Sequence, residues 1–195
     1  MDAIKRRKEI VEQEINELQK LSNKIGEEMN AVVEMIYACK GKLVIMGIGK
    51  TGIIGHKIAS SLASTGTPTI FINAAEAMHG DLGMIAKNDI VLLISNSGSS
   101  SEIINVIAPL KKIGSRLIAM TGNPNSPLAD EAELVINVGV EKEACPLGLA
   151  PTTSTTATLV MGDALSICLM ERRSFKAENY GLYHPGGALG RQLLS

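Results

Sequence analysis

The sequence contains no tryptophan and only 3% aromatic residues, so it offers few of the flat surfaces on which bases and sugars stack. Its formal net charge is −1, and no block of lysine and arginine interrupts that balance. A protein that binds the nucleic-acid backbone usually carries a basic patch. We therefore expect no nucleic-acid partner.

Cysteine is also scarce. Cys39, Cys145 and Cys168 are widely spaced and form no CxxC pair. An odd and scattered set of this kind argues against both a disulfide framework and a structural zinc site. The histidines and carboxylates show no metal-ligand spacing such as HExxH, so we expect no required metal.

Long apolar runs are missing as well. The N-terminus, MDAIKRRKEIVEQE, is charged where a signal peptide would need its apolar core, and we expect no stretch of membrane-spanning length. These absences predict a soluble, cytoplasmic protein with no membrane partner. The chain nevertheless has 45% hydrophobic residues in 195 positions, which is enough for the core of one domain.

The first 38 residues are predicted to form an amphipathic helical segment. Their apolar side chains recur at spacings of three, four or seven residues, which place them on one helix face. Gly26 is the expected position of a bend or break. This face packs either on its own domain or, in part, on a second subunit. Its members are Val11, Ile15, Leu18, Ile25, Met29, Val32 and Ile36.

Five short apolar runs follow, nearly continuous in the way that fully buried parallel strands are. Helix-like segments at about 52–64, 101–112 and 153–172 alternate with them. This alternation predicts a single α/β domain over residues 1–195, a three-layer αβα sandwich with a parallel sheet. The predicted strands are KLVIMG (42–47), TIFI (69–72), IVLLIS (90–95), RLIAM (116–120) and LVINVG (134–139).

A serine-rich stretch, ISNSGSSSE, occupies residues 94–102 at the end of the third predicted strand. Ligands bind beyond the carboxyl ends of such strands where the strand order reverses, and the free N–H groups of the following helix favour an anion. The alternative is that Ser99 or Ser100 only caps that helix. We predict a phosphate monoester site made by Ser95, Asn96, Ser97, Gly98 and Ser100.

A second glycine-rich turn, GIGKTG (47–52), follows the first predicted strand. It matches the dinucleotide pattern GxGxxG, but Asn73 stands where that motif has an acidic residue, and Val44 stands where a P-loop has its first glycine. We interpret it as a tight strand-to-helix turn in which Gly49 and Thr51 contribute to substrate binding. Lys50 is then either a ligand of the phosphate or of a polarised oxygen, or a solvated surface lysine.

A threonine-rich run, PTTSTTAT (151–158), precedes the last long predicted helix. Thr152 or Ser154 could cap this helix. The remaining hydroxyls could line the pocket.

Six motifs together carry a family resemblance. They are GIGKTG, STGTP (64–68), EAMHGDLGM (76–84), ISNSGSSSE, KEACPLGLAPTTSTTATLVMGDAL (142–165) and HPGGALG (184–190). From about residue 40 to its end, the chain resembles the sugar isomerase (SIS) domain of bacterial arabinose-5-phosphate isomerases. The resemblance implies a flavodoxin-like, five-stranded parallel sheet between helices, and assembly as a homotetramer.

The activity implied by this resemblance interconverts D-ribulose 5-phosphate and D-arabinose 5-phosphate through an enediol, supplying 3-deoxy-D-manno-octulosonate (Kdo) for lipopolysaccharide or capsule. Such an exchange needs a base at the two carbons and acids at the two oxygens, but no cofactor, and we expect none. Two alternatives stay open. One is another phosphosugar isomerase, and the other is a non-catalytic phosphosugar-binding regulatory module.

The resemblance also places Lys50, Glu102, Glu143 and His184 around the substrate, with His79 as a further candidate. We predict that Glu143 is the base, because partial burial in its loop would raise its pKa. His184 suits ring opening or proton transfer between oxygens. Glu102 is expected to contact a sugar hydroxyl or Lys50, or only the helix dipole.

Two features depart from the family pattern. Longer members carry a pair of CBS domains after this segment, whereas this chain stops at GRQLLS (190–195), so we interpret it as a form without them, either natural or shortened. The serine loop of the family commonly has glutamate where this chain has Ser99. We therefore assign no catalytic role to Ser99.

Overall fold

The computed structural model describes residues 2–186 and 192–193. Its centre is a five-stranded parallel sheet with the order β2-β1-β3-β4-β5. The predicted number and direction of the strands are confirmed, with ends that differ by one or two residues. The strands are β1 (Leu43–Gly47), β2 (Thr69–Asn73), β3 (Ile90–Ile94), β4 (Arg116–Thr121) and β5 (Leu134–Asn137).

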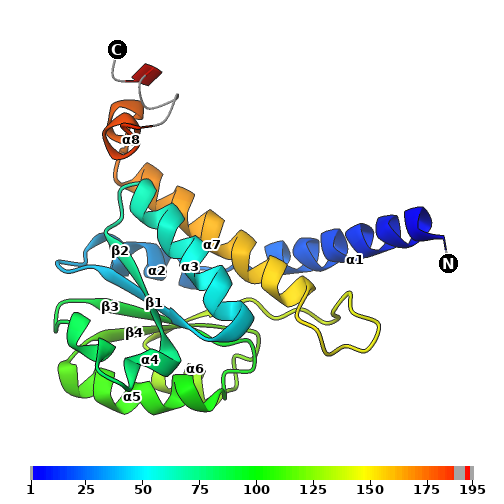
Figure 1. Cartoon of the computed structure of the whole chain (residues 1–195), viewed down its shortest axis with the longest axis horizontal. Coiled ribbons are helices and arrows are strands. Elements are labelled where there is room, and N and C mark those ends of the chain that lie inside the picture. Colours follow the sequence, from blue (N-terminus) through cyan, green and yellow to red (C-terminus); the bar gives the residue numbers. More distant parts are fainter. Residues whose placement is uncertain (1, 187–191, 194–195) are drawn as a thin grey trace.

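Helices cover both faces of the sheet and complete the three predicted layers (Figure 1). One face is covered by α2 (Glu28–Tyr37), α3 (Gly49–Ser64) and α7 (Thr153–Arg172). The other is covered by α4 (Ala74–Ala77), α5 (Ser101–Ile113) and α6 (Pro127–Glu131). The short helices α4, α6, η1 (Asp81–Met84) and α8 (Ala177–Tyr183) were not predicted.

The strands β1 and β3 are buried along their whole length because both of their faces meet helices. Alternate residues therefore enter different cores: Ile45 packs with α3 and α7, whereas Val44 packs with α5. Burial of such a side chain stabilises the fold by about 1.5–3 kcal/mol. This two-sided burial explains why the strand sequences are continuously apolar.

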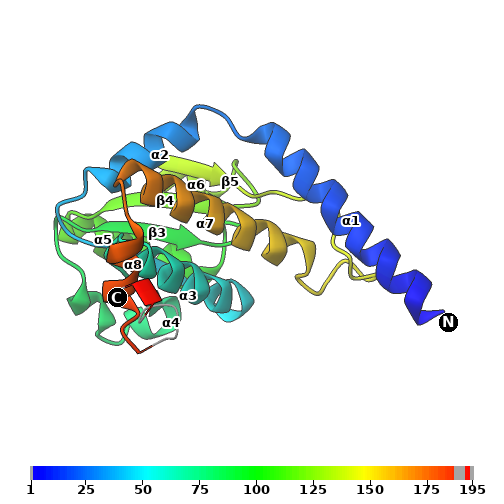
Figure 2. The same ribbon diagram turned by 90° about the horizontal axis from the view of Figure 1, so that it is seen from above.

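The N-terminal segment consists of two helices rather than one. Helix α1 (Ala3–Lys24) ends just before Gly26, where a break was predicted, and α2 begins at Glu28. The apolar face divides at the same place. Val32 and Ile36 are buried in the core, whereas Val11 and Ile15 are more than half exposed on α1, which extends from the body as an arm (Figures 1 and 2).

Helix α7 corrects one expectation. It is long and apolar enough to cross a membrane by length and composition, although no such stretch was expected. Half of that stretch is buried inside the protein, and Ala157, Met161 and Leu165 belong to the core between α7 and the sheet. This burial is typical of the central helix of a globular domain.

The strand order reverses between β1 and β3, because the chain leaves β1 toward β2 on one side and later builds β4 and β5 on the other. The loops after β1 and β3 therefore flank a crevice at the carboxyl edge of the sheet. The opposite, amino edge is closed by the end of α7, where Arg173 Nε donates a hydrogen bond to Thr67 Oγ1 at 3.1 Å. Helix α8 follows at this amino edge.

Candidate active site

The serine loop lies between β3 and α5, as predicted, and its hydroxyls bond mainly to one another. Ser95 is buried, and its hydroxyl shares a 3.0 Å hydrogen bond with the hydroxyl of Ser100 and accepts one from the Gly98 amide at 3.1 Å. The hydroxyl of Ser97 accepts hydrogen bonds from the amide and the hydroxyl of Ser99. Hydrogen bonds within the loop thus hold its polar groups in place.

The start of α5 carries no side-chain cap. Ser100 is the N-cap residue, yet no hydrogen bond joins its side chain to the first turn. The structure therefore does not show the alternative, in which Ser99 or Ser100 only caps the helix. The Ser100 hydroxyl therefore leaves the positive end of the helix dipole to other negative groups, of which the Glu102 carboxylate is one.

Gly98 has a conformation and a packing environment that exclude a side chain. Its φ is +65°, and a Cβ atom there would lie 2.0 Å from Ser126 Oγ. Its carbonyl accepts a hydrogen bond from the Leu128 amide at 3.0 Å. The serine loop is thereby packed against the start of α6.

Glu102 lies in the first turn of α5 and turns its carboxylate back toward that turn. The Glu102 backbone amide and the Ser101 hydroxyl hold the pKa of this carboxyl below its usual range. No ion pair joins Glu102 to Lys50 within the described residues. Glu102 was expected to contact a sugar hydroxyl, Lys50 or only the helix dipole, and the structure shows the contact with the helix dipole.

The turn GIGKTG is shorter than predicted, because α3 already begins at Gly49 rather than near residue 52. Gly47 and Gly52 are in close contact: a Cβ on Gly47 would lie 3.1 Å from the Gly52 Cα. This contact lets the helix start directly at the strand end. Lys50 is exposed in the first turn, and the Thr51 hydroxyl donates to the Ile48 carbonyl at 2.7 Å.

Glu143 lies in the loop after β5 and caps the start of α7. Its Oε2 accepts hydrogen bonds from the Thr152 amide at 2.8 Å, the Thr152 hydroxyl at 2.9 Å and the Ser154 amide at 3.3 Å. Thr152 is the N-cap residue, but its side chain does not cap the helix. The cap comes from Glu143 instead of from Thr152 or Ser154.

The pKa of Glu143 differs from the expectation. Burial disfavours the charged carboxylate, but the hydroxyl and amide groups of Ser154 and Thr152 favour it more strongly and hold the pKa below its usual range. The predicted upward shift is therefore wrong, because the loop supplies hydrogen-bond donors as well as burial. Glu143 is ionised at neutral pH, and its Oε1 accepts no hydrogen bond from the described residues.

A cavity of about 470 Å³ joins the serine loop to the loop of Glu143. Asn96 contributes from the first loop, and Glu143 and Lys142 from the second. Cys145 also lines it, and the backbone amides of Ala150, Leu149 and Leu147 lower the pKa of its thiol. The structure thus places Asn96 of the serine loop beside the predicted base, whereas the cavity lining does not include Ser95, Ser97, Gly98 or Ser100.

The two predicted site histidines are placed differently. His79 is exposed just after α4, in the segment that follows β2, so it belongs to the carboxyl edge beside β1. His184 ends α8 at the amino edge, where its ring stacks on Tyr180 with centroids 3.9 Å apart and its Nδ1 lies 2.9 Å from the Tyr180 carbonyl oxygen. Within one chain, His184 is therefore remote from the serine loop.

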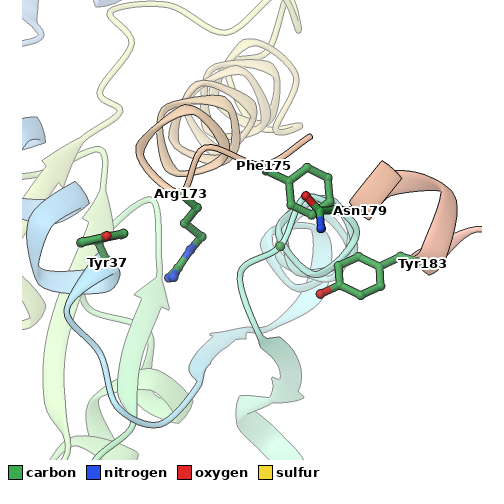
Figure 3. Close-up of a pocket in the computed structure, with 6 residues that line it drawn as sticks. Tyr37, Arg173, Phe175, Asn179 and Tyr183 are labelled. Atoms are coloured by element: carbon green, nitrogen blue, oxygen red, sulfur yellow. The ribbon is translucent and has the colours of Figure 1, made fainter. Parts of the chain in front are cut away.

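A second cavity, of about 330 Å³, lies at the amino edge near α8 (Figure 3). Its polar lining is largely paired: Arg173 donates to Thr67 Oγ1 and to the Ile36 carbonyl, and Asn179 accepts from the Lys176 amide. Across the described residues, no three histidine, cysteine or acidic side chains gather closely enough to hold a metal ion. The cavity beside Glu143 is the candidate active site.

Side chains of α1 also reach this site, which sequence reasoning missed. Gln13 Nε2 donates to the Glu143 carbonyl at 2.8 Å, and Glu17 Oε2 accepts from the Glu141 amide at 2.7 Å. Thr156 in the first turn of α7 donates its hydroxyl to Glu14 at 3.2 Å. No sequence pattern indicates these contacts, since polar positions on an amphipathic helix normally face water.

Comparison with known proteins agrees with this architecture. Residues 35–168 match the SIS domain. The chain is 56% identical over 171 residues to the arabinose 5-phosphate isomerase KdsD of Pseudomonas aeruginosa, covering 88% of this chain and 52% of that protein. It is 53% identical to KdsD of Escherichia coli K12, covering 96% of this chain and 57% of that protein.

The chain therefore spans about half the length of the curated relatives it matches. Among solved structures, it resembles Escherichia coli CFT073 c3406 in complex with arabinose 5-phosphate, with a TM-score of 0.92 and 42% identity. That match covers 94% of this chain and 98% of the other. The alternating strands and helices, the strand order and the matched residues agree: this chain belongs to the SIS domain family.

Proposed function

We propose that the protein is an aldose–ketose isomerase that interconverts D-ribulose 5-phosphate and D-arabinose 5-phosphate. The observation that carries this proposal is a helix N-terminus that follows the serine loop, together with an ionised carboxylate, Glu143, in a cavity that Asn96 of the same loop also lines. The first feature suits a phosphate, and the second suits proton abstraction from carbon. The relatives named KdsD and the solved complex with arabinose 5-phosphate support this choice of substrate.

In the proposed reaction, Glu143 Oε1 removes a proton from C1 of open-chain ribulose 5-phosphate while the C2 oxygen gains a proton. The resulting enediol then receives the carbon-bound proton at C2, and the C1 oxygen loses its proton to give the aldehyde of arabinose 5-phosphate. Atoms and charge balance without a cofactor. Because Oε2 is held by Thr152 and Ser154, only Oε1 is available as the base.

Lys50 and His184 complete the proposed mechanism. Lys50 is an exposed cation beside β1, suited to stabilise negative charge on a substrate oxygen. His184 is proposed to transfer protons between oxygens or to open the furanose, and its place at the amino edge requires that a second copy supply it. His79 at the carboxyl edge is the other candidate for contact with the sugar oxygens.

We further propose that the protein acts as a cytoplasmic homotetramer. The exposed Ile4, Val11 and Ile15 on α1 support self-association, since an arm with such side chains gains stability when a second copy covers them. The described cysteines are free thiols, in keeping with a reducing compartment. The product is proposed to supply Kdo synthesis for lipopolysaccharide or capsule.

Incorporation of solvent deuterium into ribulose 5-phosphate tests the proposed function directly. The purified protein is expected to catalyse exchange at C1 and to form arabinose 5-phosphate, whereas hexulose 6-phosphate and amino-sugar phosphates should exchange much more slowly. Faster turnover of a hexose phosphate would assign another isomerase activity. Tight binding of arabinose 5-phosphate with no exchange would assign a regulatory, non-catalytic module.

A further inference from the structure

Helix α1 holds the candidate site loop through side chains far away in the sequence. Gln13 bonds to the carbonyl oxygen of Glu143, and Glu17 bonds to the amide of Glu141. Lys20 strengthens the second contact, because its Nζ lies 2.8 Å from Glu17 Oε1 and 2.5 Å from Glu141 Oε2. Main-chain groups on both sides of residue 142 are thereby tied to one helix.

The contact of Glu17 is buried and therefore strong. Its exposed fraction is only 5%, although it is a charged residue on a helix whose N-terminal part is largely exposed. A buried carboxylate is tolerated when cations and N–H donors satisfy it, and here Lys20 and the Glu141 amide do so. Loss of the charge would leave the Glu141 amide with a weaker acceptor.

The Glu143 residue is consequently held at two points. Its main chain is fixed by Gln13 of α1, and its side-chain Oε2 is fixed by the start of α7. The same α1 helix also accepts a hydrogen bond from Thr156 of α7 through Glu14. The free oxygen, Oε1, therefore has a position defined jointly by α1 and α7.

We propose that Gln13 and Glu17 are positioning residues for the Glu143 carboxylate, so that the α1 arm takes part in catalysis by fixing the base. The inference rests on the proposed function in one respect, namely that Glu143 is the base. A general base works only within hydrogen-bonding reach of the proton that it removes, so displacement of its loop lowers kcat more than it raises KM.

Three substitutions of Gln13 separate positioning from packing. Gln13→Glu keeps the shape but sets an acceptor against the Glu143 carbonyl, Gln13→Leu removes the hydrogen bond, and Gln13→Lys restores a donor. We expect kcat to fall by about tenfold or more in Gln13→Glu, to fall less in Gln13→Leu and to recover in Gln13→Lys, with KM nearly constant. Glu17→Gln should also lower kcat.

Gln19→Glu is the matched control, because Gln19 lies on the same helix, is exposed, and its side chain bonds to no described residue. It should keep the wild-type kcat. Hydrogen–deuterium exchange of the 139–150 segment gives a second readout that does not depend on turnover. Exchange there should accelerate in Gln13→Glu and Glu17→Gln but not in Gln19→Glu, with the melting temperature confirming a folded protein.

The two proposals fail in different ways. Unchanged exchange of the 139–150 segment in Gln13→Glu and Glu17→Gln would overturn the positioning role, whatever the enzyme's substrate. So would a loosened segment with an unaltered kcat, or a kcat that is higher in Gln13→Leu than in Gln13→Lys. If the wild type showed no turnover while exchange of the 139–150 segment still accelerated in the Gln13 and Glu17 variants, the proposed function would be overturned. The contacts of Gln13 and Glu17 would then hold the loop without a role in catalysis.

Discussion

The hydroxyls of Ser95 and Ser100 share a hydrogen bond of 3.0 Å, which turns the N-cap residue of α5 toward the strand and away from its own helix. A serine at an N-cap usually bonds to the amides of the first turn. Here the Ser100 hydroxyl makes no such bond, and the first turn of α5 lies beside the crevice between β1 and β3. This relationship makes the serine loop suited to bind an external anion.

Replacement of Ser97 and Ser100 by alanine should raise KM for the phosphorylated substrate at least about tenfold, because each hydrogen bond to a charged group contributes about 1.5–3 kcal/mol. Steady-state kinetics of the double variant provides the measurement. Ser64→Ala is a suitable control, since that hydroxyl bonds within its own helix, to the Ser61 carbonyl. An unchanged KM in the double variant would reduce the serine loop to a structural turn.

Glu143→Gln should lower deuterium exchange at C1 at least about a hundredfold while substrate binding is retained, because glutamine cannot accept a proton from carbon. The amide oxygen can still accept hydrogen bonds from Thr152 and Ser154, so the cap on α7 should survive. Glu171→Gln, an exposed change, serves as the control. Near-normal exchange in Glu143→Gln, together with its loss in His184→Ala, would make His184 the base.

The fold was predictable because its signals are local. Each strand is a short apolar run between turns, and each long helix repeats apolar residues with the helical period. The division of the N-terminal segment at Gly26 followed from glycine's poor helix propensity. The strand order and the extension of α1 depend on contacts between distant residues, so neither could be derived from composition or periodicity.

The candidate site was predictable only in part for the same reason. The serine loop could be placed at a strand end, but the Ser95–Ser100 bond requires the folded turn. The pKa of Glu143 was predicted in the wrong direction because its donors, Thr152 and Ser154, come from the start of the next helix. The contact between Gln13 and Glu143 spans 130 positions, and no local sequence pattern predicts it.

Acid should destabilise the fold through Asp89, which lies immediately before β3. Burial disfavours its charge, but hydrogen bonds from Lys42 and Ala86 outweigh this and hold the pKa of Asp89 below its usual range. A carboxyl with a lowered folded-state pKa stabilises the fold above its unfolded value, about 3.9, and loses that contribution as pH falls through the folded value. The unfolding free energy should therefore drop below about pH 4.

Asp89→Asn tests this dependence. The variant should be less stable at pH 7 by ~1–3 kcal/mol, because the Lys42 ammonium loses its buried partner, and its unfolding free energy should vary less with pH in the acidic range. Urea unfolding at a series of pH values provides the measurement. Glu131→Gln, which removes an exposed pair with Lys111, should leave the profile unchanged. Parallel acid profiles of Asp89→Asn and the wild type would contradict the assignment.

The separation of His184 from the serine loop within one chain leads to a prediction about assembly. Light scattering at micromolar concentration should show an oligomer, and Val11→Lys with Ile15→Lys should weaken it, since both side chains are more than half exposed on α1. Glu12→Lys, on the exposed part of the same helix, is the charge-matched control. A fully active monomer would exclude a site shared between copies.

Subunit mixing then locates His184. If each site takes Glu143 from one copy and His184 from another, co-refolding equal amounts of inactive Glu143→Gln and His184→Ala should restore wild-type sites at a frequency of about a quarter, the product of two one-half probabilities. Mixing Glu143→Gln with Lys50→Ala should restore none, because both residues lie at the carboxyl edge of the same chain. Recovery in the second mixture, or no recovery in the first, would contradict the assignment of Glu143 and His184 to different copies. Activity restored in the first mixture alone would place His184 in the site of a neighbouring copy.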